Sequence, residues 1–305
     1  MNRLASRLIG KALYLSTQPF ITCENLVKIY KVADLEVVAL QGIDLIINSG
    51  EMMALVGPSG SGKSTLMNIF GGLDTPTAGR VYVGDYNLLE MTRREQVIYR
   101  RREVGFVWQQ TARNLLPYLS ARENVELPMA LDGLPARQRR ERAQMLLEQV
   151  GLGGRLNHRP DRLSGGEQQR VAIAVSMANK PRLLLADEPT GEVDSEAAEQ
   201  IFSTLRAFNR DHGVTVIIVT HDGSVSARVD RVVGMRDGRT STEILRRRAS
   251  DGQIASADEY AIVDRVGRLQ LPQAYLESLG IAERARLKLR EDHVGVYPDE
   301  QDTHA

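Results

Sequence analysis

One segment, GPSGSGKST at Gly57–Thr65, constrains the possible folds of this chain more than any other part of the sequence. It follows the apolar run Met52–Val56, typical of a central strand in a parallel sheet, and a helix is expected from about Ser64. The glycines let backbone N–H groups close around phosphate oxygens, and the dipole of the following helix favours an anion there. A strand, a glycine-rich loop and a helix in this order predict an α/β fold with a phosphate site.

Each position of this loop has an expected part in binding ATP and Mg²⁺, the two cofactors that the motif predicts. The Lys63 ammonium should reach the β- and γ-phosphates, and the Ser64 hydroxyl should ligate Mg²⁺. A glycine-rich turn without a ligand would not explain the strand before the loop and the helix after it. The residues expected to contact the nucleotide here are Gly57, Pro58, Ser59, Gly60, Ser61, Gly62, Lys63, Ser64 and Thr65.

Two carboxylates, Asp187 and Glu188, end a second apolar run at Leu183–Ala186. The carboxyl ends of parallel strands meet at one edge of a sheet, beside the phosphate loop. Asp187 is therefore expected to hold Mg²⁺ through its water shell, and Glu188 to polarise the attacking water. The alternative is an acidic turn after a strand. A phosphate loop at the same edge of the sheet favours the Mg²⁺ and catalytic roles over this alternative.

Two polar side chains follow further strand-like runs and should reach the same edge. His221 comes after Val214–Thr220, and Gln109 comes after Val104–Trp108. We expect His221 to contact the γ-phosphate, and the Gln109 amide to touch Mg²⁺ or the lytic water. Taken alone, each would be an ordinary structural or surface side chain.

The segment LSGGEQ at Leu163–Gln168 supplies a second possible phosphate contact. Ser164 is a natural N-cap for a helix, and the following Gly165 and Gly166 would let a phosphate approach the backbone. On its own this is an ordinary capped helix start. Because the chain already has a loop for its own nucleotide, a second such helix start indicates contact with a partner's nucleotide.

Together these residues resemble the ABC ATPase family, over about Ile21–Arg239. The resemblance implies ATP hydrolysis by two copies of the chain that pack head to tail, with the signature of one covering ATP held by the other. It assigns a nucleotide contact to Tyr30, at the position of an adenine-stacking aromatic, although a buried strand-end tyrosine is the alternative. The further motifs that it identifies are the Gln loop at Gln109, the signature residues Ser164, Gly165, Gly166 and Glu167, Walker B at Leu183–Asp187, the catalytic Glu188, the D-loop Asp194 and the switch His221.

Within that family, three segments resemble the lipoprotein-releasing and macrolide-exporter group, which includes the LolD, MacB and FtsE types. They are Gly71–Gly79, Asn114–Pro117 and Glu123–Pro128. The resemblance implies a separate membrane permease as partner, contacted through Gln109–Pro128. It also implies a peripheral position at the cytoplasmic face of the membrane.

The rest of the sequence suggests how the chain is divided. No run reaches the roughly 18 apolar residues that a membrane-spanning helix needs. The 39 basic and 39 acidic residues balance, so no global charge attracts nucleic acid. The expected divisions are an amphipathic or disordered leader over 1–19, the ATPase domain over 20–245, a linker over 246–257, and a small domain over 258–300. Within the ATPase domain, the resemblance implies an antiparallel β subdomain and a helical subdomain at about 93–178.

This small C-terminal domain is expected to be β-rich and resembles the AbrB-type swapped-hairpin fold. The expected elements are a strand, turn and strand over Ile262–Pro272, a helix over Gln273–Leu279, and a hairpin of Arg286–Arg290 with His293–Tyr297. Such domains are small dimers that often bind DNA. Residues 258–305 carry a net charge of −4, which opposes phosphate contacts, so we expect dimerisation and not DNA. The alternatives are a non-transport regulator that acts on nucleic acid and a scaffold that scarcely hydrolyses ATP.

Overall fold

The computed structural model describes residues 19–32, 35–110, 114–248, 254–282 and 284–298. The expected leader over 1–19 lies outside these ranges, apart from Pro19 at the start of the first strand. Over the described ranges, no helix combines the length and the apolar character that crossing a membrane requires.

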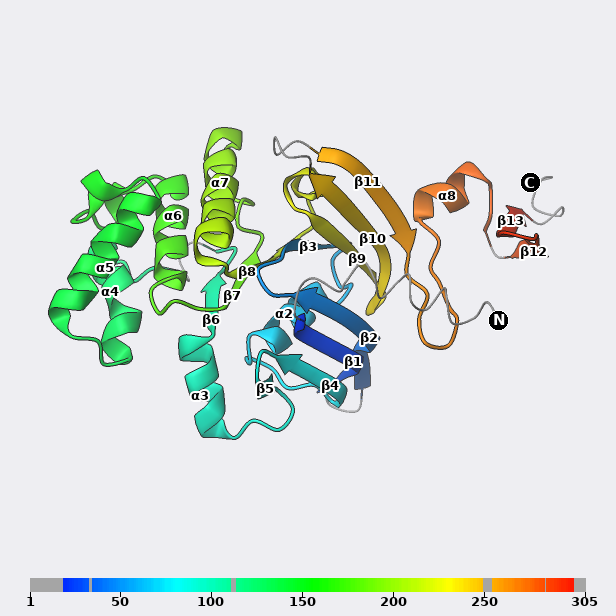
Figure 1. The fold of residues 1–305 in the computed structure, drawn as a ribbon, viewed down its shortest axis with the longest axis horizontal. Coiled ribbons are helices and arrows are strands. Elements are labelled where there is room, and N and C mark those ends of the chain that lie inside the picture. The colour runs from blue at the N-terminus through cyan, green and yellow to red at the C-terminus, as the bar shows by residue number, and fades with distance from the viewer. Residues whose placement is uncertain (1–18, 33–34, 111–113, 249–253, 283, 299–305) are drawn as a thin grey trace.

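A seven-stranded sheet forms the centre of the molecule, in the order β11-β10-β9-β3-β8-β7-β6 (Figure 1). Strands β9, β3, β8, β7 and β6 run parallel, whereas β10 and β11 extend the sheet by antiparallel pairing. The apolar runs predicted as central strands therefore lie where expected. The strands are β3 (Met52–Val56), β6 (Val104–Val107), β7 (Leu183–Asp187), β8 (Thr215–Thr220), β9 (Arg231–Arg236), β10 (Arg239–Arg248) and β11 (Ile254–Ala261).

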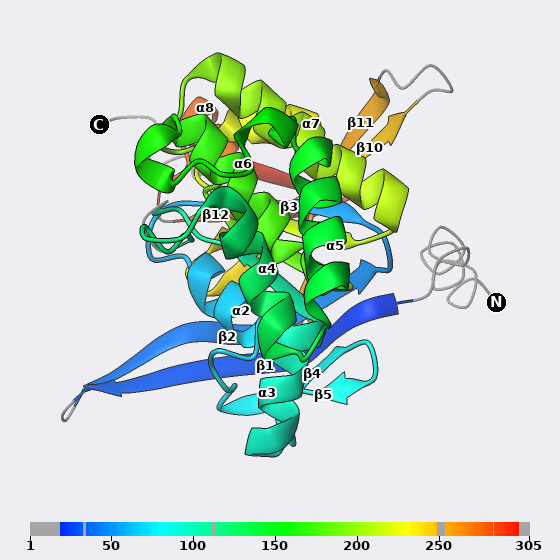
Figure 2. The same cartoon turned by 90° about the vertical axis from the view of Figure 1, so that its left-hand side faces the viewer.

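A second, antiparallel sheet has the order β2-β1-β4-β5. Figure 2 shows β1 and β2 running side by side as one long ribbon. The apolar face of this sheet shares one core with α2 and with strands of the central sheet. The elements are β1 (Pro19–Val32), β2 (Leu35–Asn48), β4 (Ala78–Val83), β5 (Tyr86–Asn87) and the helix after the phosphate loop, α2 (Lys63–Phe70).

Helices form a separate side of the molecule, and their starts follow from local sequence. Thr92, Ser120 and Ser164 each cap a helix, and in each case a glutamate three residues later completes a capping box. Helices α3, α4, α5 and α6 lie within residues 93–178, the range predicted for a helical subdomain, and β6 in the same range joins the central sheet. The helices are α3 (Arg93–Arg102), α4 (Ala121–Leu131), α5 (Ala136–Gln149), α6 (Gly165–Ser176) and α7 (Ser195–His212), with short 3₁₀ turns at Gly153–Arg155, Pro160–Arg162 and Gly223–Arg228.

The prediction of a linker over 246–257 has to be corrected. Residues 246–248 belong to β10 and residues 254–257 belong to β11, and the two strands pair with each other. Residues 249–253 lie outside the described ranges. Here Arg246 is half-buried and Ser256 and Ala257 are exposed, so these residues carry no apolar pattern although they belong to paired strands and not to a linker.

The C-terminal unit matches the expectation only in part. Helix α8 (Gln273–Ser278) and the hairpin of β12 (Ala285–Leu289) with β13 (Val294–Pro298) lie where predicted. The strand, turn and strand expected over Ile262–Pro272 are absent from the described residues. Instead, the Asp264 carboxylate accepts the backbone N–H groups of Val266 and Arg268, which folds this segment into a local turn.

Candidate nucleotide-binding site

The phosphate loop lies between β3 and α2, and its glycines are required by its geometry. Gly57, Gly60 and Gly62 have φ values of 153°, 78° and 98°, which side-chain-bearing residues rarely adopt. A Cβ atom on Gly57 would also come within 2.1 Å of the Met235 carbonyl oxygen. The loop therefore turns tightly against strand β9 and presents its backbone to the space above α2.

Lys63 lies across the mouth of this loop. Its ammonium donates to the carbonyl oxygens of Gly57 and Pro58, each at 2.8 Å, and its side chain is buried. Burial lowers the pKa of Lys63, while the nearby carboxylates of Glu188 and Asp187 act in the opposite direction. The cation is therefore held at the place where phosphate oxygens would enter.

A cavity of about 370 Å³ opens beside the loop. Its lining brings together Lys63, Ser64, Gln109, Asp187 and Glu188, which come from the loop and from the ends of β6 and β7. Sequence reasoning placed all five at one edge of a parallel sheet, and they line one cavity. The cavity is also lined by Val37, Val38 and Ala39 of β2 and by Val219 of β8, which the sequence analysis did not single out.

Glu188 is the centre of the polar contacts in the site. The Gln109 amide Nε2 donates to Glu188 Oε2 at 2.9 Å, and His221 Nδ1 lies 2.6 Å from Glu188 Oε1. Glu188 has φ = 42°, an uncommon value for a residue with a side chain, directly after β7. Its backbone N–H donates to the Val219 carbonyl at 2.8 Å, which ties the ends of β7 and β8 together. Glu188 thus contacts each of the other two side chains predicted to be catalytic.

The oxygen donors in the cavity suit Mg²⁺. Ser64, Gln109 and Asp187 offer a hydroxyl, an amide and a carboxylate oxygen, the hard ligands that Mg²⁺ prefers. Among the described residues, no three His, Cys, Asp or Glu side chains are grouped to hold a metal by themselves. Mg²⁺ usually completes its shell with water and substrate phosphates, so one carboxylate fits this ion. Burial raises the pKa of Asp187, Glu188 raises it further, and Lys63 opposes both.

The signature residues lie elsewhere and do not line this cavity. Ser164 and Glu167 form the capping box of α6, and the side chain of Ser164 and the backbone of Gly165 are exposed. Gly166 is buried against α7, where a Cβ atom would come within 2.7 Å of Ala197 Cβ. Asp194 caps α7 by accepting from the Ala197 N–H at 2.8 Å. The contact of these residues with a partner's ATP stays a prediction.

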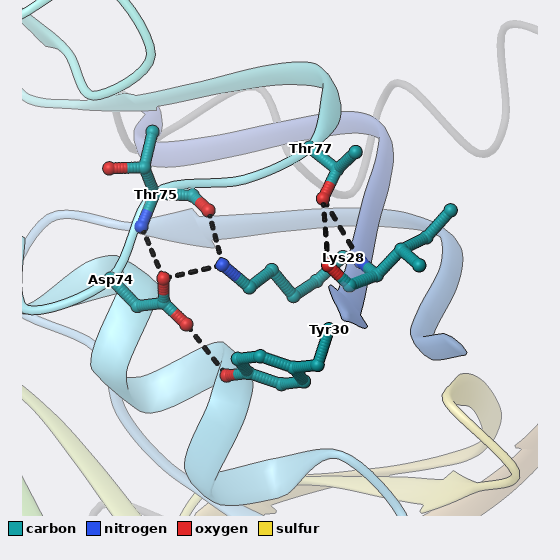
Figure 3. A network of polar contacts seen from close by, with 6 residues as sticks. Lys28, Tyr30, Asp74, Thr75 and Thr77 are labelled. Atoms are coloured by element: carbon teal, nitrogen blue, oxygen red, sulfur yellow. Dashed lines mark hydrogen bonds and ion pairs between the residues drawn. The ribbon is translucent and has the colours of Figure 1, made fainter. Parts of the chain in front are cut away.

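Tyr30 does not line the cavity either. Its hydroxyl donates to Asp74 Oδ2 at 2.6 Å, and the Lys28 ammonium lies 4.7 Å from the centre of its ring (Figure 3). Lys28 also donates to Asp74 Oδ1 at 2.5 Å. The predicted stacking of Tyr30 on adenine therefore stays a prediction.

Comparison with known proteins identifies relatives of this chain. The family model described as ABC transporter matches residues 40–191. The macrolide export ATP-binding/permease protein MacB of Rhodopirellula baltica is 48% identical over 225 residues, which cover 73% of this chain and 32% of MacB. An uncharacterised ABC transporter ATP-binding protein of Methanocaldococcus jannaschii is 47% identical over 218 residues, covering 72% of this chain and 96% of that protein. The chain thus spans about a third of the MacB relative and nearly all of the archaeal one.

Solved structures agree with this result. The ATP-binding cassette MJ0796, a dimer in a post-hydrolysis state with ADP and Pi, superposes with a TM-score of 0.67 and is 41% identical. The match covers 73% of this chain and 97% of the cassette. With the phosphate loop and the Glu188 contacts in place, the chain belongs to the ABC transporter family and contains an ATP-hydrolysing ATP-binding domain of the MacB, LolD and FtsE type.

Proposed function

We propose that this chain is the nucleotide-binding subunit of an ABC transporter of the lipoprotein-release or efflux kind, in which two copies enclose two ATP molecules and drive a separate permease. The observation that carries the proposal is the position of Glu188, held between Gln109 and His221 at the edge of the cavity. The exposed signature at Ser164 and Gly165 supports a site completed by a second copy.

The proposed chemistry assigns one task to each side chain. Lys63 and the N–H groups of the loop hold the phosphates. Glu188 accepts a hydrogen bond from the attacking water and increases its nucleophilicity, while Gln109 and His221 orient the Glu188 carboxylate. Ser64 and Asp187 would hold a bound Mg²⁺, which would neutralise part of the phosphate charge.

A groove of about 390 Å³ supports contact with a permease. It lies between α3, β6, α4 and α6, and its apolar lining includes Phe106, Pro128 and Leu131, with Arg100 and Arg101 also contributing. Leu131 is 66% exposed and adjoins the other apolar residues of the groove, so together they form an apolar patch that a partner could cover. We assign this groove to a cytoplasmic helix of the permease, which would hold the chain at the cytoplasmic face of the membrane. Pro128 belongs both to the groove and to the predicted Gln109–Pro128 contact region.

The permease contact can be tested with Leu131→Glu. The variant should lose copurification with the permease and keep its basal ATP hydrolysis, because Leu131 is outside the nucleotide cavity. Leu279→Glu, at a residue 51% exposed in the C-terminal unit, is the control and should retain the permease. Undiminished copurification of the Leu131 variant would refute the groove assignment, and a purified chain without ATP hydrolysis would refute the enzymatic role.

The C-terminal unit, we propose, is an AbrB-like element that pairs with a second copy. No side chain of the described residues 262–282 and 284–298 is buried, and β12 and β13 pair only with each other. Leu287, Leu289 and Val294 are 66%, 84% and 56% exposed. A lone two-stranded hairpin is marginally stable in water, so an apolar partner surface is needed. The acidic charge of this unit leaves a DNA-acting regulator without support.

Deleting residues 263–305, which leaves β11 and its pairing with β10 in place, tests the contact between copies. The mass of the nucleotide-free protein should then fall from dimer to monomer, while the full chain stays dimeric. As a milder version, Leu289→Glu in the full chain should shift the same equilibrium, since Leu289 has no packing to lose within its own chain. A dimer fraction unchanged in both variants would rule the C-terminal contact out.

A further inference from the structure

The turn between β9 and β10 touches both the phosphate loop and the wall of the nucleotide cavity. The Gly238 N–H donates to the Ser61 carbonyl of the loop at 3.2 Å, and the Gly238 carbonyl accepts from the Gln41 N–H of β2 at 2.8 Å. A Cβ atom on Gly238 would come within 2.7 Å of the Ala39 carbonyl, and Ala39 lines the cavity. This turn therefore cannot move without disturbing the loop or β2.

Arg239, the next residue, joins this turn to the C-terminal unit. Its Nη2 donates to Gln41 Oε1 at 3.2 Å, and Gln41 Nε2 in turn donates to the Asp237 carbonyl at 3.0 Å. Arg239 Nη1 lies 3.5 Å from Asp264 Oδ2. Both side chains of this ion pair are half-buried, at 25% and 23% exposure, so water screens the pair less than it screens a fully exposed one.

Asp264 is held rigidly enough to act as a fixed anion. Its Oδ1 accepts from the backbone N–H groups of Val266 and Arg268 at 3.0 and 2.9 Å, and its Oδ2 accepts from Arg268 Nε at 2.8 Å. The Arg268 backbone N–H in particular keeps the pKa of Asp264 below its ordinary value, so the carboxylate is ionised at neutral pH.

Further contacts hold the same segment against the ATPase domain. Arg265 Nη2 lies 2.7 Å from Asp44 Oδ1 of β2. The Ile262 N–H donates to the Ser241 carbonyl at 2.9 Å, and its side chain packs on the core shared by the two sheets. The start of α8 is reached by Arg236 Nη1, which donates to Gln273 Oε1 at 3.1 Å. Movement of residues 262–273 is thus transmitted to β2, β9 and β10.

We propose that Asp264 is a positioning residue for ATP, acting through Arg239 and the Asp237–Gly238 turn on the phosphate loop. The inference rests on the proposed ATPase function. The C-terminal unit would then have two roles. It pairs with a second copy, and it influences the conformation of the phosphate loop and so the affinity for ATP. By thermodynamic reciprocity, ATP bound at the loop stabilises the docked position of residues 262–273.

The first test separates nucleotide affinity from turnover in the full chain. Asp264→Asn keeps an oxygen for the two backbone N–H groups and removes the charge that faces Arg239. We expect the KM for ATP to rise about threefold, the effect of losing one partly screened ion pair, with kcat unchanged. Asp264→Glu should recover part of the loss. The matched control is Asp292→Asn in the C-terminal hairpin, where the carboxylate contacts its neighbour His293, and it should leave KM unchanged.

The second test asks whether the two residues act as one unit. Arg239→Gln combined with Asp264→Asn should raise KM no more than the worse single variant, because either change already breaks the pair. Hydrogen exchange of residues 262–273 should also slow when ATP binds to a Glu188→Gln background, and Asp264→Asn should weaken that protection.

A KM for Asp264→Asn equal to wild type, additive effects in the double variant, or exchange unaffected by ATP would each overturn the inference. These outcomes presuppose a wild-type chain that hydrolyses ATP. A wild-type chain without hydrolysis would instead refute the proposed function, so the two failures can be told apart.

Discussion

The ATPase domain and the C-terminal unit contain similar strands that differ in how deeply their leucines are buried. Strand β7 and strand β12 each have five residues and each contain leucines. Leu183, Leu184 and Leu185 of β7 are fully buried, whereas Leu287 and Leu289 of β12 are 66% and 84% exposed. A continuous apolar run lies within a sheet covered on both faces, while the alternating pattern of β12 has an apolar side that no described residue of the chain covers. The apolar side chains of β7 are therefore packed within one chain, whereas those of β12 are left for the partner copy that we propose.

The largest expected effect concerns the chemistry of the ATPase domain. Glu188→Gln should lower ATP turnover by about 100- to 10,000-fold, because an amide cannot polarise the attacking water. Nucleotide should still bind, so an ATP-bound dimer should accumulate, visible by mass in a variant that also lacks residues 263–305. Glu192→Gln, at a nearby exposed glutamate outside the cavity, serves as the control. Turnover that survives in the Glu188 variant would remove Glu188 from the mechanism.

Next in size is the stability difference between the two leucine sites. Leu185→Ala in β7 should lower the free energy of unfolding by about 2–5 kcal/mol, because it leaves a cavity in a fully packed core. Leu289→Ala should change it by less than about 0.5 kcal/mol in the monomer. Urea unfolding followed by the fluorescence of Trp108, the single tryptophan, measures both. Equal losses at the two sites would contradict the contrast drawn here.

A smaller effect is expected at Tyr30 of the ATPase domain, the residue predicted to stack on adenine. If adenine stacks on the ring, Tyr30→Ala should raise the KM for ATP about tenfold, within the usual range for base–aromatic stacking. Tyr30→Phe keeps the ring and loses only the hydrogen bond to Asp74, so it should stay near wild type. If both variants weaken ATP binding equally, the hydroxyl contact and not stacking is what matters.

The smallest effect follows from the raised pKa of Asp187. The folded chain holds this proton more tightly than the unfolded chain, so Asp187 lowers stability as pH rises above its ordinary pKa of 3.8, and the loss is complete once the pH exceeds the raised pKa. Asp187→Asn should therefore raise the thermal midpoint at pH 7, while it abolishes Mg²⁺-dependent hydrolysis. The gain should shrink as the pH approaches 3.8. A midpoint that falls at pH 7 would show that the carboxylate supports the fold.

Most of the nucleotide site could be predicted because its motifs are local. The strand before Gly57–Thr65, the capping box at Ser164 and the acids that end β7 each depend on residues close in sequence. The predicted linker over 246–257 was wrong because the end of β10 and the start of β11 carry no apolar signature, although the two strands pair. Val37–Ala39 were missed because nothing in their sequence distinguishes a cavity wall from any other strand.

By itself, the sequence determined the loop that holds phosphate, the helix caps and the buried strands, since hydrogen bonds and apolar runs act over short separations. Only the tertiary structure decided which side chains meet. Glu188 contacts Gln109 and His221, which are 79 and 33 residues away, because β6, β7 and β8 lie side by side in the sheet. The link from Asp264 to Arg239 likewise exists because the segment after β11 folds back on the β9–β10 turn, and no sequence motif encodes that approach.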